Sequence, residues 1–296
     1  MKNAVNKREF LELAGLASAG IAGVVFMGIA FQRTWIRSRQ DVIPSAVPTA
    51  GAAALILAGL VFASRSWAAL FGAEASGRAL ARGFYTAQLG KYVPGGIWQA
   101  VGQVGLATRA GARWPQASTA FAVQAVTQVA AGGTVGAGLL AFGWGLPWGI
   151  RLSALLSLLL LLPLHRAWMV RAVRFLLQVL RKETSGDIVP SQERILRSYG
   201  WAVGTILGSG LAFALLASSV HATSSFAAAT PAFALAWTAG FLAIPFPSGL
   251  GVREAVLIGI LGRTGGAAPV IAASVAHRLV TMAGELVMIL VARVRA

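Results

Sequence analysis

The chain has 296 residues, of which 57% are hydrophobic and only 11% are charged, against roughly a quarter charged in soluble domains. So few charged groups could not cover a water-soluble protein of this length, which excludes a soluble domain and predicts an integral membrane protein. Cysteine is absent, which excludes disulfides, thiolate nucleophiles and zinc ribbons. The net charge of +16 fits loops that face anionic lipid better than it fits a nucleic-acid interface.

Apolar segments of about the 20 residues that a membrane span requires recur along the chain. We therefore predict an all-α, polytopic integral membrane protein with about seven transmembrane helices in a single membrane domain, residues 1–296. The expected spans are Leu11–Phe31, Pro48–Ala63, Ala117–Phe142, Trp148–Leu164, Tyr199–Val220, Phe226–Phe246 and Pro269–Ala292. The start, Lys7-Arg8-Glu9-Phe10-Leu11, looks like a twin-arginine export signal, but no A-x-A-like cleavage site follows it. An uncleaved first span is expected.

The longest polar stretch, Arg166 to Arg197, is rich in basic residues and is predicted to be cytoplasmic by the positive-inside rule. It divides the chain into possible halves, 48–165 and 199–296, joined by a basic segment, 166–198. Basic and apolar residues alternate at helical spacing over 171–182, which predicts a helix along the inner membrane surface. The N-terminus is then also cytoplasmic. Arg33, Arg37 and Arg39 then lie on the non-cytoplasmic side of the membrane, contrary to the positive-inside rule.

Two further apolar segments, Phe84–Ala107 and Leu250–Leu261, are broken or too short to span. Each contains a core of proline and glycine, Pro94-Gly95-Gly96 in the first and Pro247-Ser-Gly249 in the second, with Gly251 close behind. Proline removes a backbone donor, and glycine permits angles that a helix excludes. Irregular backbone at membrane depth requires protein or a water-filled cavity around it. Both segments are thus predicted to turn sharply beside a cavity.

The two broken segments also have matching surroundings, because residues of the same kind follow Pro94 and Pro247 at spacings that differ by one. Weak internal symmetry of this kind is typical of transporters built from duplicated halves. The alternative is that the match arose by chance, because proline and glycine are frequent in membrane helices. The spacing does not distinguish parallel from inverted halves. The matching positions are Arg109 and Arg263, Gly111 and Gly265, Pro115 and Pro269, Gln124 and Arg278, and Thr127 and Thr281.

Among nine acidic residues, only Glu254 and Glu285 fall inside apolar segments. An ionisable group at mid-membrane costs at least about 2.5–3.5 kcal/mol, so it usually has a partner. Ser274, Arg278, Thr281 and Glu285 are spaced four, three and four residues apart and form one helical stripe that must face protein or water. Arg253 and its neighbour Glu254 point about 100° apart on a helix. We expect Glu254 near Arg278, or Glu285 near Arg253; a purely structural ion pair is the alternative role.

Lys91, Tyr92 and Trp98 flank the first proline-glycine core. Lys91 and Tyr92 could contact a lipid phosphate at the membrane interface. Snorkelling of Lys91 and an interfacial-belt position for Tyr92 and Trp98 are equally consistent with the sequence.

The segment Lys91-Tyr-Val-Pro-Gly-Gly-Ile-Trp98 is similar to the K-Y-x-P-G-x-x-W signature of the lysylphosphatidylglycerol synthase transmembrane-region family. Residues 247–254 resemble its second signature, P-x-G-x-G-x-R-E, with Ser248 where glycine is common, and Ser64-Arg-Ser-Trp67 resembles its L-R-W element. The resemblance covers nearly the whole chain. It implies a flippase-like protein related to the membrane half of multiple peptide resistance factors, which moves aminoacylated phosphatidylglycerol between leaflets. Because no further domain follows the last predicted span, we expect no transferase and no enzymatic activity.

Lipid translocation is therefore the leading hypothesis, with membrane lipids bearing anionic head groups as partners, no cofactor and a cell-membrane location. A secondary transporter that uses Glu254 and Glu285 as a proton relay is an alternative. Others are a membrane enzyme acting on lipid phosphates and a non-catalytic partner of an envelope-biosynthesis glycosyltransferase; a homo-oligomer is a further possibility. The candidate substrate-binding residues are Lys91, Tyr92, Pro94, Gly95, Gly96, Trp98, Gly249, Gly251, Arg253, Glu254, Arg278 and Glu285.

Overall fold

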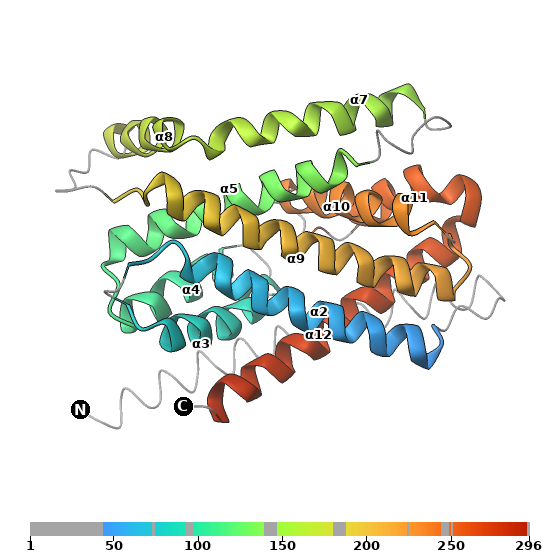
Figure 1. Cartoon of the computed structure of the whole chain (residues 1–296), viewed down its shortest axis with the longest axis horizontal. Coiled ribbons are helices and arrows are strands. Elements are labelled where there is room, and N and C mark those ends of the chain that lie inside the picture. The colour runs from blue at the N-terminus through green and yellow to red at the C-terminus, as the bar shows by residue number, and fades with distance from the viewer. Residues whose placement is uncertain are drawn as a thin grey trace.

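The computed structural model describes residues 44–72, 75–92, 97–138, 147–179, 188–223, 225–243, 249 and 251–294. All regular structure in these ranges is helical (Figure 1). The all-α prediction is confirmed for the described residues. The expected first span and the proposed export motif lie outside them.

Three helices are long and apolar enough to cross a membrane: α2 (Ala46–Ala68), α9 (Gln192–Ser219) and α12 (Ala267–Val294). A fourth candidate is a bent pair, in which α7 (Trp148–Leu156) with the 3₁₀ helix η2 (Ser157–Leu164) meets the helix of Arg166–Phe175 at 77°; it counts as a span only if the two parts form one. Helix α5 (Trp114–Gly136) is as long as α2 but less apolar, and α10 (Phe226–Leu242) has only 17 residues. A membrane protein is supported, while the count of about seven spans is not confirmed.

Each broken segment forms part of a helical hairpin. Helix α3 (Gly77–Gln88) runs through the 3₁₀ turn η1 (Leu89–Tyr92) towards α4 (Trp98–Arg109), and α3 packs against α4. In the second, α10 leads to α11 (Val252–Gly265) and packs against it. The first core, Pro94, Gly95 and Gly96, lies outside the described residues, as do Pro247 and Ser248.

The described part of the second core has the backbone that its glycines predict. Gly249 has φ +66° and Gly251 has φ +81°, in the left-handed region that favours glycine. A Cβ atom on Gly249 would lie 2.6 Å from the Cα atom of Gly240 in α10, so the turn and α10 touch through backbone. The predicted sharp turn is confirmed at these two positions.

The order of helices repeats along the chain. Helix α2, the first hairpin and α5 are followed, after α7, η2 and α8 (Arg166–Val179), by α9, the second hairpin and α12. Helices α2 and α9 lie side by side and run in opposite directions, and α5 and α12 also cross the bundle in opposite senses (Figure 1). The hairpins enter the bundle from opposite ends (Figure 1). This arrangement fits inverted halves, although duplication itself stays a prediction.

Helix α2 ends and α9 begins at the same end of the bundle (Figure 1), and the helix ends that lie there carry most of the described arginines. Helix α8 lies at this end, bent by 77° from the preceding helix, with Trp168 and Phe175 exposed. The bend and the mixture of basic and apolar side chains fit the predicted surface helix. The arginines at this end are Arg65, Arg78, Arg82, Arg109, Arg113, Arg166, Arg171, Arg174, Arg194, Arg197 and Arg293, against Arg151 and Arg263 at the other.

Candidate functional site

A stripe of buried polar side chains runs along the middle of α12. Ser274, Arg278 and Glu285 are 5%, 7% and 1% exposed. Helix α12 has 28 residues and is therefore about 42 Å long. The stripe is centred near its midpoint, which places these groups near mid-depth if α12 crosses the membrane. The prediction that the stripe faces protein rather than lipid is confirmed.

One end of the stripe holds the second hairpin through Glu254, at the start of α11. Its Oε1 atom accepts hydrogen bonds from Ser274 Oγ at 2.8 Å and from Arg278 Nη2 at 3.1 Å. Its Oε2 atom accepts a bond from the backbone N–H of Gly251 at 2.8 Å. The expected contact between Glu254 and Arg278 is confirmed. The same carboxylate caps α11 and holds it against α12, which is a structural role.

The other end of the stripe holds the first hairpin through Glu285. This carboxylate forms an ion pair with Lys91, and its Oε2 atom accepts a hydrogen bond from the Tyr92 hydroxyl at 3.0 Å. The alternative that paired Glu285 with Arg253 is wrong, because Glu285 pairs with Lys91 while the Arg253 side chain lies against Gly240 of α10. Snorkelling of Lys91 to the interface is also wrong, since its side chain points inwards to a carboxylate that would otherwise be buried unpaired.

Arg253 occupies the space that Gly240 leaves open on α10. A Cβ atom on Gly240 would lie 2.6 Å from Arg253 Cγ and 2.9 Å from its Nε. The guanidinium lies 5.9 Å from the centre of the Trp237 ring, a cation–π contact. Its buried Nε atom has no hydrogen-bond partner, and no carboxylate within the described ranges forms an ion pair with it.

Arg253 nevertheless belongs to the same polar cluster as the two ion pairs. It interacts electrostatically with Arg278, Glu254 and Tyr92. Tyr92 in turn interacts with Glu285 and with both arginines. Tyr92, just before the first core, and Arg253, just after the second, therefore share one electrostatic environment with the buried groups of α12. We call Lys91, Tyr92, Arg253, Glu254, Arg278 and Glu285 the mid-bundle cluster.

His277 adjoins this cluster without joining a metal site. Its Nε2 atom lies 3.1 Å from the Ser209 carbonyl oxygen, and its ring packs against Phe213 and Phe233. No group of three potential metal ligands among His, Asp and Glu occurs in the part of the chain that the structure describes. The arrangement fits a packed core histidine.

The first half carries a neutral pair in a comparable place, between the second arm of the hairpin and the long helix that follows. Gln103 on α4 donates to Gln124 on α5 at 2.5 Å, and Gln124 donates to the Ala63 carbonyl at 3.3 Å. Gln124 matches Arg278 in the repeat register, but the sequence analysis did not identify Gln103 as its partner. Both glutamines are buried. Gln103 could have been identified from the sequence, because it is a polar residue on the second arm of the broken segment.

Trp98 is not part of the mid-bundle cluster. It starts α4 and is 46% exposed, in contrast to Tyr92 on the other side of the core. Pro94, Gly95 and Gly96 fall outside the described residues. Of the other nine predicted site residues, the structure brings six into the cluster, while Gly249 and Gly251 shape the adjoining turn.

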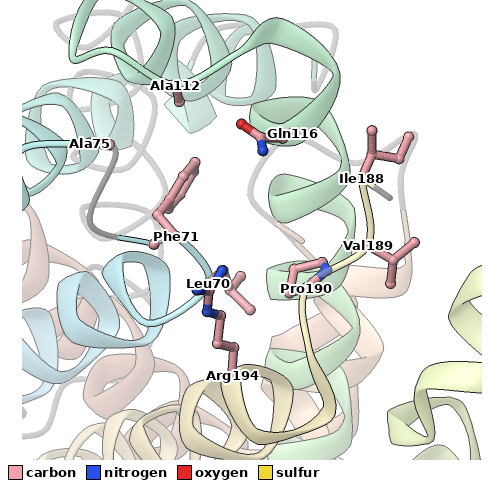
Figure 2. A pocket seen from close by; sticks show the side chains of 10 residues that line it. Leu70, Phe71, Ala75, Ala112, Gln116, Ile188, Val189, Pro190 and Arg194 are labelled. Atoms are coloured by element: carbon pink, nitrogen blue, oxygen red, sulfur yellow. The ribbon is translucent and has the colours of Figure 1, made fainter. Parts of the chain in front are cut away.

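Sequence reasoning missed a small pocket at the arginine-rich end of the bundle (Figure 2). The Phe71 ring and the Gln116 amide reach into it, and the Arg194 guanidinium lies against Gly72 (Figure 2). Its volume of about 70 Å³ is well below the ~300 Å³ of typical ligand pockets. The three loops that line this pocket share no recognisable spacing pattern in the sequence. It is lined by Leu70, Phe71, Gly72, Ala75, Ala112, Gln116, Ile188, Val189, Pro190 and Arg194.

Comparison with known families agrees with the two signatures. A protein-family profile described as the lysylphosphatidylglycerol synthase TM region matches residues 13–288. The match includes both hairpins and all residues of the mid-bundle cluster. A search of curated proteins finds no match. Since the matched region covers nearly the whole chain, the protein belongs to the lysylphosphatidylglycerol synthase TM region family.

Proposed function

We propose that this protein is a flippase-like translocator that moves a phospholipid or a lipid-linked head group between leaflets. Membership of the family supports a membrane role related to lysylphosphatidylglycerol synthesis or flipping. The observation that carries the proposal is that one helix, α12, binds residues of two opposed hairpins, next to their proline-glycine cores, through buried polar groups near its midpoint.

The physical argument starts from the cost of these groups. Each charge at mid-membrane costs at least about 2.5–3.5 kcal/mol, and five ionisable side chains that can carry charge lie in the cluster. Ion pairing offsets part of that cost, but hydrophobic residues would avoid it altogether. A polar route for a head group gives these residues a function, while acyl chains remain in the bilayer.

The distribution of arginines gives the proposed orientation. The end of the bundle that carries α8 and the start of α9 is rich in arginine, which by the positive-inside rule supports a cytoplasmic location for this end. This agrees with a cell-membrane protein whose N-terminus is cytoplasmic, which is part of the proposal. We propose anionic lipids as partners of the protein. We also propose that its role involves no enzymatic chemistry.

The test is reconstitution into liposomes that contain head-group-labelled lipid, with lipid movement followed by quenching from outside. We expect wild-type protein to move label between leaflets and Glu254→Gln to slow this movement strongly. Glu193→Gln is the matched control, because Glu193 is a highly exposed carboxylate paired with Arg197 at the bundle end. Folded wild-type protein that moves no lipid, or that takes up a small solute instead, would overturn the proposal in favour of a secondary transporter.

A further inference from the structure

A series of neutral glutamine side chains lies between the arginine-rich end of the bundle and the mid-bundle cluster. Gln103 on α4 pairs with Gln124 on α5, and one turn back along α4 the Nε2 atom of Gln99 donates to Gln88 Oε1 at 3.4 Å. Because α4 and α5 run in opposite directions from a short turn, Gln99 is level with Gln128 of α5. We call these five residues the glutamine ladder. It ends at Gln88, the last residue of α3, next to η1.

Buried hydroxyl groups connect the ladder to the arginine-rich end. Thr127, one turn along α5 from Gln124, has its Oγ1 atom 3.3 Å from Ser198 Oγ of α9. Ser198 Oγ in turn lies 2.9 Å from Ser66 Oγ of α2. All three hydroxyl residues are 0% exposed. Ser66 and Ser198 lie within two turns of the helix ends that meet there, so the polar series extends from the bundle end to the first hairpin.

Two buried carbonyl oxygens of the ladder have no hydrogen-bond partner within the described part of the chain, Gln103 Oε1 and Gln128 Oε1. Gln103 is 1% exposed. A buried acceptor without a donor is unfavourable, and amides that served only to join helices would be paired with one another. Water is the small donor that satisfies such groups inside proteins, where one molecule makes about two to four hydrogen bonds. The unpaired oxygens therefore point to water along the ladder.

The opposite side of the mid-bundle cluster is built differently. Around α10, α11 and the end of α9, the core consists of apolar side chains such as Phe213, Leu257, Ile260 and Val270. The hydroxyl of Thr230 is buried on this side, but among the described residues no hydrogen bond links it to another side chain. A connected polar series thus approaches the cluster from the arginine-rich end and not from the other.

We propose that the glutamine ladder binds water that enters at the arginine-rich end and reaches the mid-bundle cluster, while the opposite side is closed to water. Every member of the ladder is neutral, so it offers donors and acceptors to water but no opposite charge to a lipid head group. This inference goes beyond the proposed function and does not depend on it, because the same residues would hold water whatever the protein transports.

Cysteine accessibility tests the inference, because the chain has no native cysteine. Gln103→Cys in liposomes is treated from either side with a small, impermeant methanethiosulfonate, and Arg174→Cys reports which side carries the arginine-rich end. Ala120→Cys is the matched control, since Ala120 is also 1% exposed but belongs to the apolar core, one turn nearer that end than Gln124. Apolar burial makes a thiol inert, so Gln103→Cys should react at least about tenfold faster than Ala120→Cys. It should react only from the side that labels Arg174→Cys.

Two further variants complete the test. Ser198→Cys replaces a single atom of a fully buried residue, so it keeps the fold more readily than Gln103→Cys and should be labelled from the same side. Ala273→Cys probes the apolar side, where Ala273 is 0% exposed, and should react from neither side. Thermal unfolding of each variant is compared with that of the wild-type protein to show that it is folded.

The outcomes are decided without a transport step. If folded Gln103→Cys reacts no faster than Ala120→Cys, the ladder is dry and the inference is overturned; if Gln103→Cys does not fold, Ser198→Cys decides by the same comparison. Labelling of Gln103→Cys from the opposite side, or of Ala273→Cys from that side, would overturn the sidedness. A protein that moves no lipid but shows the expected labelling would refute the proposed function alone.

Discussion

The ion pair between Lys91 and Glu285 permits a quantitative test of how the first hairpin is held. Removing one partner of a buried ion pair costs about 3–5 kcal/mol, because the other charge is left unpaired. Lys91 is 25% exposed and Tyr92 still donates to Glu285, so we expect about 2–3 kcal/mol for Lys91→Met, below that range. Glu285→Gln should cost less, since Lys91 is 25% exposed and its charge is less deeply buried than that of Glu285. The coupling energy between the two changes should then be at least about 1.5 kcal/mol.

The measurement is a double-mutant cycle on unfolding of the purified protein in detergent or bicelles. Glu193→Gln with Arg197→Gln forms the control cycle, since these side chains are 78% and 60% exposed and surface pairs contribute about 0.2–1 kcal/mol. Hydrogen bonds between membrane helices average about 0.6 kcal/mol in such cycles. A coupling energy for Lys91 and Glu285 no larger than this would refute the buried ion pair.

Two further predictions concern packing and orientation. Gly265→Ala should lower the free energy of unfolding by about 1–3 kcal/mol or more, because its Cβ would lie 1.7 Å from the Ala222 carbonyl oxygen; Gly259→Ala, measured in parallel, should be close to neutral, and equal effects would contradict the close approach. Since the chain has no cysteine, Arg174→Cys and Gly149→Cys provide unique thiols. An impermeant maleimide should label Arg174→Cys only from the cytoplasmic side and Gly149→Cys only from outside, and the reverse pattern would invert the proposed topology.

The helices and the polar stripe could be predicted because both depend on local sequence. The apolar runs of α2, α9 and α12 are long enough to span a membrane, and the polar residues between positions 274 and 285 recur at helical spacing. Glu254 and Arg278 were paired correctly because they were the nearest opposite charges expected at similar depth. Their helices are also consecutive, which restricts how far apart the two side chains can lie.

The partner of Glu285 could not be predicted in the same way. Lys91 is 194 residues away, and only the packing of α3 against α12 brings it close. Its position beside a proline-glycine turn was equally consistent with the membrane interface. The pocket at the arginine-rich end was missed for a related reason, since its loops are brought together by tertiary packing and have no common motif.

The 3₁₀ helix η2 changes how far a short segment of chain can reach. Its eight residues rise about 2.0 Å each, against 1.5 Å in an α-helix. With the nine residues of α7, the segment extends to about 30 Å, the thickness of the hydrocarbon core, whereas a pure α-helix of this length would be about 4 Å shorter. Ser157 fixes the start of the stretched part by donating to the Gly133 carbonyl on α5 at 2.9 Å. If this segment crosses the membrane, the tighter and longer 3₁₀ winding reduces its hydrophobic mismatch without requiring the bilayer to thin around it.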